Sequence, residues 1–294
     1  MANVQPFRAI KPPPDIVHQI AAPPYDVMSR EEACEMVEGR PNSFLHITRS
    51  EVDLPTDVDP YDSRVYEKAR DNYAAFKRRI PLKRDAQPHY YVYSLEMEGH
   101  RQTGIAATPA VDDYNRDVIK KHEKTRRAKE DDRTRHILTT RAQTGPVFLT
   151  YRDHEELDRL TASVTEAAPL FDFTADDGVT HTVWQVPPSL SARVRTAFEK
   201  LPCLYIADGH HRAASAGRAA AQCRDEDTIG ASEAAYDFFL CVIFPASQLQ
   251  ILPYNRVVKD LGGLTRQEKP SIGENLFTLY SPFSLHLRDH TNHK

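Results

Sequence analysis

The sequence predicts an α+β protein, loosely mixed α/β, on three observations. Segments with helical spacing of apolar residues are interspersed with short β-branched and aromatic runs. Strand-like runs also follow one another directly, which a strict βα alternation does not do. Apolar residues make up 40% of the 294 residues, enough for a sizeable core. We expect one α+β region over residues 1–264, with two subdomains at about 1–115 and 116–264, and an atypical, poorly ordered tail over 265–294.

The first quarter of the chain is rich in proline. KPPPD and AAPPYDV predict ordered surface loops, because proline fixes φ and has no amide hydrogen to donate. Ser29, with Glu31 and Glu32 following it, is typical of a helix N-cap. Residues 61–78 predict an amphipathic helix, since apolar side chains recur there at helical spacing: Val65, Ala69, Tyr73 and Phe76.

In the rest of the chain, segments with helical spacing of apolar residues and segments with strand-like spacing follow one another less regularly. Two β-rich runs around Glu98-Gly99 predict a hairpin, and the charged segment 116–141 is expected to turn helical near Asp131. The next predicted elements are a strand at PVFLTY, a helix over 153–167 capped by Asp153, strands at LFDF and VTHTVWQV, and a helix from Pro187-Pro188 to Lys200. A strand ending at Ile206, a helix over 213–221 and the strand-like AYDFFLCVIFP follow.

Composition excludes several function classes. A net charge of −4 argues against a protein that coats nucleic acid or a membrane with its whole surface. The four cysteines lack metal-site or disulfide-framework spacing, no apolar run is long enough to span a membrane, and the N-terminus lacks the core of a secretory signal. We therefore expect a cytoplasmic protein that acts on small molecules. The sequence does not fix the oligomeric state, for which a homodimer is one option.

The stretch LYIADGHHRAASAGRAA, residues 204–220, places its polar cluster at a predicted strand-to-helix turn. The first amides of a helix have no intrahelical partner, and its dipole favours an anion there. Gly209 permits close approach of a ligand, and Arg212 offers a fork matched to phosphate oxygens. The simpler alternative is that Asp208 caps the helix and both histidines are surface residues. A metal site is disfavoured, because adjacent histidines point in diverging directions.

A second cluster is the basic segment KKHEKTRRAKEDDRTRH. Residues 116–141 contain ten Lys/Arg against five Asp/Glu, which attracts polyanions such as nucleotide phosphates. Glu123, surrounded by cations, would stay ionised and suits a general base. The alternative is a solvated charged helix, in which Arg133 and His136 form surface pairs.

A third set of candidates, two residues, lies near the N-terminus. Asp26 follows a proline-set turn, and Asn42 lies at a loop boundary, which are both positions from which side chains contact ligands. Structural roles in a turn or a helix cap explain these two residues nearly as well.

Several motifs together resemble a bacterial and archaeal family known as domain-of-unknown-function family 1015. The resemblance covers roughly Val4 to Leu264. Among characterised proteins the family resembles free-serine kinases, and its core is similar to the ParB/sulfiredoxin superfamily. The motifs that carry the resemblance are AAPPYDV, NSFLHITR, KKHEKT, DDRTRHILTT, GPVFLTY, YIADGHHRAASA and ILPYNRVV. After Leu264 the family pattern is lost, so we expect a truncated or replaced C-terminal part.

The resemblance implies a ParB/sulfiredoxin-like core and roles for individual residues. The Asp-Gly-His-His-Arg run of archaeal serine kinases matches residues 208–212, and their His-Glu pair is matched by His122-Glu123. Mg²⁺ and ATP or ADP are the implied cofactors. The implied catalytic residues are Glu123, Asp208 and His211, and Asp208 also contacts the metal. The implied phosphate and nucleotide contacts are Gly209, His210, His211, Arg212, Thr125 and Arg133. The implied substrate contacts are Asp26, Asn42 and His122.

Two functions from different classes follow. The leading one is a kinase that transfers a phosphoryl group from a nucleotide to the hydroxyl of free L-serine or a similar amino acid. The other is a nucleotide-binding regulator without turnover, which uses the same turn to hold phosphates. The acidic balance and the lack of a helix-turn-helix disfavour nucleic acid as its partner. A metal-dependent hydrolase ranks third, because the thirteen histidines are scattered.

Overall fold

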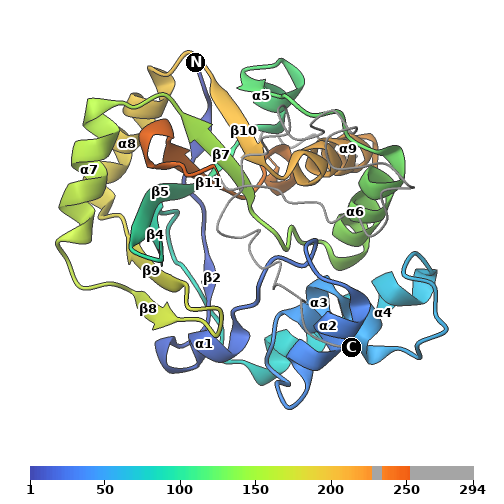
Figure 1. Ribbon diagram of the computed structural model, residues 1–294. Helices are drawn as coiled ribbons and strands as arrows, with labels where there is room; N and C mark the ends of the chain where they lie inside the picture. Colours follow the sequence, from blue (N-terminus) through green and yellow to red (C-terminus); the bar gives the residue numbers. More distant parts are fainter. Residues whose placement is uncertain (227–233, 252–294) are drawn as a thin grey trace, which may run out of the picture.

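Short strands from both halves of the chain form one mixed sheet. The computed structural model describes residues 1–226 and 234–251. In this part of the chain the sheet has nine strands in the order β6-β10-β7-β11-β5-β4-β9-β8, with β1 paired to β5 (Figure 1). The strands are β1 (Val4–Gln5), β4 (Tyr91–Met97), β5 (His100–Pro109), β6 (Ile119–Lys120), β7 (Val147–Tyr151), β8 (Phe171–Thr174), β9 (Thr180–Gln185), β10 (Leu204–Asp208) and β11 (Cys241–Pro245). Two more, β2 (Ile10–Lys11) and β3 (Lys83–Arg84), pair separately.

Helices pack against this sheet, which confirms the predicted mixed α+β class. The helices are α1 (Val17–Ile20), α2 (Arg30–Val37), α3 (Leu45–Thr48), α4 (Ser63–Arg79), α5 (Val111–Asn115), α6 (Arg127–Thr140), α7 (Glu155–Thr165), α8 (Pro188–Glu199) and α9 (His210–Glu226). In Figure 1, α7 and α8 lie to the left of the sheet and α6 and α9 to its right. Helix α6 contacts both α9 and α4, so it joins the N-terminal helices to the sheet.

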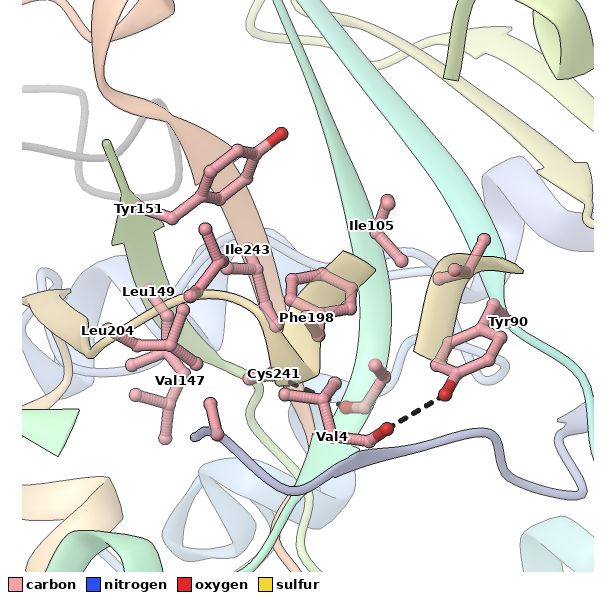
Figure 2. Close-up of a cluster of buried hydrophobic side chains, with 14 of the residues drawn as sticks. Val4, Tyr90, Ile105, Val147, Leu149, Tyr151, Phe198, Leu204, Cys241 and Ile243 are labelled. Atoms are coloured by element: carbon pink, nitrogen blue, oxygen red, sulfur yellow. Dashed lines mark hydrogen bonds between the residues drawn. The ribbon is translucent and has the colours of Figure 1, made fainter. Parts of the chain in front are cut away.

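The main core forms where alternate strand residues meet the helices. On β7, Val147, Leu149 and Tyr151 point into this core, together with Phe198 of α8 (Figure 2). Full burial of each such side chain contributes about 1.5–3 kcal/mol. The hydroxyl of Tyr90 donates to the carbonyl oxygen of Val4 at 2.7 Å, which ties the N-terminal strand to this core. The other face of β7 presents Phe148 to a second cluster.

Local signals in the sequence located several elements correctly. The predicted hairpin is β4 and β5, and its turn has positive φ at Glu98 (51°) and Gly99 (79°), as a two-residue hairpin turn requires. Ser29 caps α2 in a capping box with Glu32. The predicted amphipathic helix is α4, which buries Val65, Ala69 and Phe76.

Other local predictions were wrong. Asp153 does not cap α7: the N-cap is His154, and the Asp153 carboxylate instead accepts the amide of Ser247 at 3.1 Å. Helix α6 begins at Arg127 rather than near Asp131, and α9 extends beyond the predicted 213–221 at both ends. The predicted tail over 265–294, and ILPYNRVV after Ile251, lie outside the described residues.

Three observations bear on what the sequence led us to expect about membrane spans, cysteines and subdomains. Across residues 1–226 and 234–251, we find no helix with the length and hydropathy needed to cross a membrane. All four cysteines lie in the described part, and none of them is paired. Strands from the two expected subdomains share the sheet, because β5 pairs with β11 and β4 pairs with β9.

Candidate functional site

The two motifs that are distant in sequence leave the sheet side by side. Strands β6 and β10 are parallel, with Leu204 opposite Ile119 and Tyr205 opposite Lys120. Since parallel strands end at the same edge, the loop after β6 and the turn after β10 emerge together. Strand β7 runs antiparallel to β10, so its first residues, preceded by Gly145 and Pro146, lie at this edge too.

The turn after β10 depends on a glycine. Gly209 has φ +90°, a conformation that side chains with a Cβ rarely adopt. A Cβ at this position would lie 3.0 Å from Nε and 3.1 Å from Cζ of Arg212. The guanidinium group therefore lies directly against the turn, and both the backbone and the available space require glycine.

The first amides of α9 lie at the turn after β10. The amide of Ala213 donates to the carbonyl of Gly209 at 2.9 Å, which is the first bond of the helix. Within residues 1–226 and 234–251, we find no acceptor for the amides of His210, His211 and Arg212. These amides, at the positive end of the helix dipole, favour an anion such as a phosphate oxygen.

Arg212 is the most heavily bonded residue of the site. Its side chain is 12% exposed, and its NH2 donates to Asp208 Oδ2 at 2.5 Å, while NH1 donates to the carbonyl of Pro146. Asp26 Oδ2 lies 3.7 Å from the same NH2. Burial opposes the charge of Arg212, yet Asp26 and Asp208 raise its pKa above the usual value. The guanidinium is thus permanently charged and firmly placed.

Asp208 is the carboxylate nearest to the turn. Burial raises its pKa, and Asp26 adds to this effect, while Arg212 and the amide of Gly209 act in the opposite direction. About a third of each carboxylate side chain remains exposed, 31% at Asp208 and 35% at Asp26. The two acids therefore leave oxygen surface beside the guanidinium that a cation or a ligand can contact.

The two histidines of the turn face the basic loop. His211 Nε2 accepts the amide of Arg126 at 3.0 Å, and His210 Nε2 accepts the amide of His122 at 3.4 Å. Burial, with His122 and His211 nearby, lowers the pKa of His210 to about 4. Burial also lowers the pKa of His211. Both rings are therefore neutral at pH 7.

The loop between β6 and α6 carries the candidate base. Glu123 is 57% exposed, and its Oε2 lies 3.4 Å from Nδ1 of His210. Thr125 is already engaged, because its hydroxyl donates to Glu130, which also pairs with Arg218. Several basic side chains of this region are exposed, which keeps the potential around Glu123 positive: Lys124, Arg126, Arg127 and Lys129.

A pocket opens next to Arg212. It is a small hollow, partly open to solvent, and its lining includes Tyr25, Arg133, His136, Thr144, Gly145 and Arg212. The guanidinium carbon of Arg133 lies 4.0 Å from the centre of the Tyr25 ring, a cation–π contact. Arg133 also pairs with Asp132 at 3.3 Å. The pocket thus combines two arginines with an aromatic wall.

Comparison with known proteins identifies the family. A family model described as "Protein of unknown function (DUF1015)" matches residues 4–291. The chain belongs to this family. The match reaches residue 291, so the family pattern continues beyond Leu264. The expectation that this pattern is lost after Leu264 was therefore wrong. No curated protein and no solved structure matches the chain, so the likeness to serine kinases and to the ParB/sulfiredoxin superfamily stays a proposal.

In this DUF1015 protein the structure gathers most of the predicted site residues. Residues 208–212, His122 and Glu123 meet at the sheet edge, Asp26 approaches Arg212, and Arg133 lines the neighbouring pocket. Asn42 does not join them, because its amide bonds with Gln19 and Arg79.

The candidate site also contains residues that were not predicted from the sequence: Tyr25, Thr144, Gly145 and the carbonyl of Pro146. The signals available were the position of Tyr25 beside Asp26 in AAPPYDV and the Thr-Gly-Pro run immediately before a strand.

The carboxylates of Asp208 and Asp26 are of the type that binds Mg²⁺. Within the described residues, no group of three or more His, Cys, Asp or Glu side chains has the arrangement of a metal site. Magnesium, however, is usually bound by one or two carboxylates together with substrate phosphates. Asp208 and Asp26 provide such oxygens beside the turn, so the residues present fit Mg²⁺ bound with a nucleotide.

Proposed function

We propose that this DUF1015 protein is a small-molecule kinase, which transfers a phosphoryl group from ATP or ADP to the hydroxyl of free L-serine or a similar amino acid. The observation that carries the proposal is the turn at Gly209, where amides without an acceptor among the described residues and a fixed guanidinium converge beside a small pocket. The likeness of residues 208–212 and His122-Glu123 to serine-kinase motifs supports the choice of reaction.

Each part of the site has a role in phosphoryl transfer. The amides of residues 210–212 and Arg212 bind and orient the phosphates, and the basic loop adds positive charge. Mg²⁺, held by Asp208 and Asp26 with the phosphates, would offset their negative charge. Glu123, on the exposed loop, accepts the proton of the acceptor hydroxyl. Phosphoryl transfer needs mainly positioning and charge stabilisation, which this set of residues supplies.

The pocket is too small for a whole amino acid, so we place the acceptor at its mouth, with the carboxylate toward the two arginines. Arg133 and Arg212 provide cationic groups for its carboxylate, and Tyr25 provides an apolar wall. An amino acid bound here would lie next to the phosphate end of the nucleotide, as an in-line transfer requires.

The direct test is formation of O-phosphoserine from L-serine, Mg²⁺ and ATP or ADP. We expect Glu123→Gln to lower kcat by about 10²–10⁴-fold, because it removes a positioned base. We expect Arg212→Lys to weaken nucleotide binding by about 10-fold or more, since it keeps the charge but loses the fork. Glu166→Gln and Arg78→Lys, both at exposed residues outside the site, serve as matched controls.

The outcomes separate two functions. Product that depends on Glu123 and Arg212 supports the kinase. Nucleotide binding that depends on Arg212, without product from any amino acid with a hydroxyl, supports the regulator. Absence of both binding and product contradicts the phosphate site itself.

A further inference from the structure

The tandem histidines at the start of α9 turn their rings toward the loop over 121–126. Arg126 donates its amide to His211 Nε2 at 3.0 Å, and His122 donates its amide to His210 Nε2 at 3.4 Å. A backbone amide can only donate, so each Nε2 must be the unprotonated acceptor nitrogen. In the neutral ring the proton therefore resides on Nδ1, for both histidines.

The contacts flank Glu123 on both sides. His122 precedes it, Arg126 follows it, and His210 Nδ1 lies 3.4 Å from its Oε2. The His210 side chain is only 4% exposed, and its ring makes an edge contact with the His122 ring, with centres 4.3 Å apart. His210 thus links the backbone and the carboxylate of the same short segment, one with each ring nitrogen.

We propose that His210 and His211 are positioning residues, which clamp the loop over 121–126 to α9 and so set Glu123 above the helix start. Phosphate contact is left to Arg212 and the backbone amides. This inference rests on the proposed function for the role of Glu123, but the clamp is a property of the protein without any ligand.

The chemistry explains why histidine occupies both positions. Lysine and arginine carry donors only, so neither can accept a backbone amide. A neutral imidazole can accept an amide at Nε2, which both histidines do, and it keeps a donor at Nδ1, which at His210 faces the Glu123 carboxylate 3.4 Å away. Glutamine replaces only the accepting atom, because its Oε1 reaches about as far as Nε2 but provides no donor at the Nδ1 position.

The first test measures amide hydrogen exchange in the protein without nucleotide. We expect the Arg126 amide to exchange roughly 3- to 10-fold faster in His211→Leu than in the wild type, the effect of losing one hydrogen bond. His211→Gln should restore protection. An Arg126 amide that exchanges equally fast in all three proteins would overturn the clamp.

A second measurement needs no variant, so it holds even if a leucine variant does not fold. Nitrogen-15 spectra of the imidazoles at pH 7 report which nitrogen is protonated. We expect His210 and His211 to show Nδ1–H with an unprotonated Nε2. A ring that is protonated at Nε2 cannot accept an amide there and would contradict the proposal.

The third test separates positioning from phosphate contact. In His210→Leu we expect kcat for phosphoserine formation to fall about 10-fold or more with the nucleotide Kd unchanged, and no further fall on adding Glu123→Gln. An increase in the nucleotide Kd would instead indicate that the His210 ring contacts phosphate, which would overturn the inference. If no variant and no wild type forms product, the proposed kinase fails, while exchange and nitrogen-15 data still decide the clamp.

Discussion

At the scale of single residues, the site depends on groups whose freedom is removed by their neighbours. Arg212 is held by Asp208, by the carbonyl of Pro146 and by the absence of a side chain at Gly209. A guanidinium fixed in this way loses little entropy when it binds an anion, so its contribution to affinity is larger than that of a free surface arginine.

Gly209→Ala is the sharpest test of this arrangement. We expect a loss of about 1–3 kcal/mol in the free energy of unfolding, from strain at positive φ, and weaker nucleotide binding from displacement of Arg212. Gly178→Ala is the matched control: its φ is +81° and nothing lies within 4 Å of the new Cβ. Urea unfolding and nucleotide titration of both variants provide the measurement. Equal nucleotide affinity in the two variants would contradict the role of Arg212.

A pH-sensitive ion pair lies in the N-terminal helices. His46 Nδ1 contacts both oxygens of Asp53 at 3.0 Å, and its Nε2 faces the carbonyl of Arg40 at 3.3 Å. The hydrogen bond to Asp53 raises the pKa of His46 above its ordinary value of 6.5, although burial opposes this. Burial disfavours the Asp53 charge, but hydrogen bonds from His46 and Asn72 lower the pKa of Asp53 overall.

The signs of these shifts give a prediction. A raised pKa in the folded state means that the contribution of His46 is complete below pH 6.5 and disappears as pH rises through the folded pKa. We expect His46→Gln to be less stable than the wild type by about 1 kcal/mol at pH 6, and the difference to shrink toward pH 9. Urea titrations across this range, with the exposed His18→Gln as control, measure it. A difference that grows with pH would refute the pairing.

The residue-scale prediction from the sequence was strongest where one local motif holds all the chemistry. The strand-to-helix turn at residues 208–212 was predicted correctly, because the glycine, arginine and acid there adjoin a strand and a helix in sequence; the role of these residues stays a prediction. The balance of charge around Arg212 was not found, because Asp26 and Pro146 reach it from distant parts of the chain. The engagement of the histidines with the loop escaped detection for the same reason.

At the scale of elements, strands and helices follow local periodicity, whereas their ends follow tertiary contacts. The hairpin of β4 and β5 and the cap at Ser29 were predictable, since turn and capping residues act within a few positions. The role of Asp153 was not predictable, because its carboxylate accepts the amide of Ser247, which is distant in sequence, instead of capping α7.

Close packing between β5 and β11 makes a second glycine test. A Cβ at Gly104 would lie 2.7 Å from the carbonyl oxygen of Ile243 and 2.8 Å from the ring of Phe244. We expect Gly104→Ala to lower the free energy of unfolding by about 1–3 kcal/mol, through overpacking in the sheet. Gly99→Asn, at a hairpin turn with positive φ and open space, should change it by less than about 0.5 kcal/mol. Thermal and urea unfolding distinguish the two, and equal losses would be inconsistent with the packing.

At the scale of the whole molecule, one sheet unites the halves that composition suggested as subdomains. Strand β5 pairs with β11 and β4 with β9, and the main core takes residues from both halves. The fold class was predictable from the mixture of periodicities. This pairing was not, because strand order depends on contacts between segments that share no local signal.

Unfolding should therefore be a single event across residues 1–226 and 234–251. Trp184, the one tryptophan in the sequence, is buried in β9 and donates to the carbonyl of Ala167 at 3.0 Å, so its fluorescence reports on the sheet. We expect its urea transition to coincide with that of far-ultraviolet circular dichroism. Two separated transitions would instead indicate independently stable halves.

Because β6 and β10 lie at one end of the strand order, an insertion at the other end stays away from the candidate site. The hairpin turn at Gly178 lies between β8 and β9, at the far end of the strand order from this pair, and nothing crowds its Cβ position. A fluorescent reporter grafted into that turn would leave the neighbouring exits of β6 and β10 intact. Such a fusion would allow ligand binding at the candidate site to be tested in cell extracts.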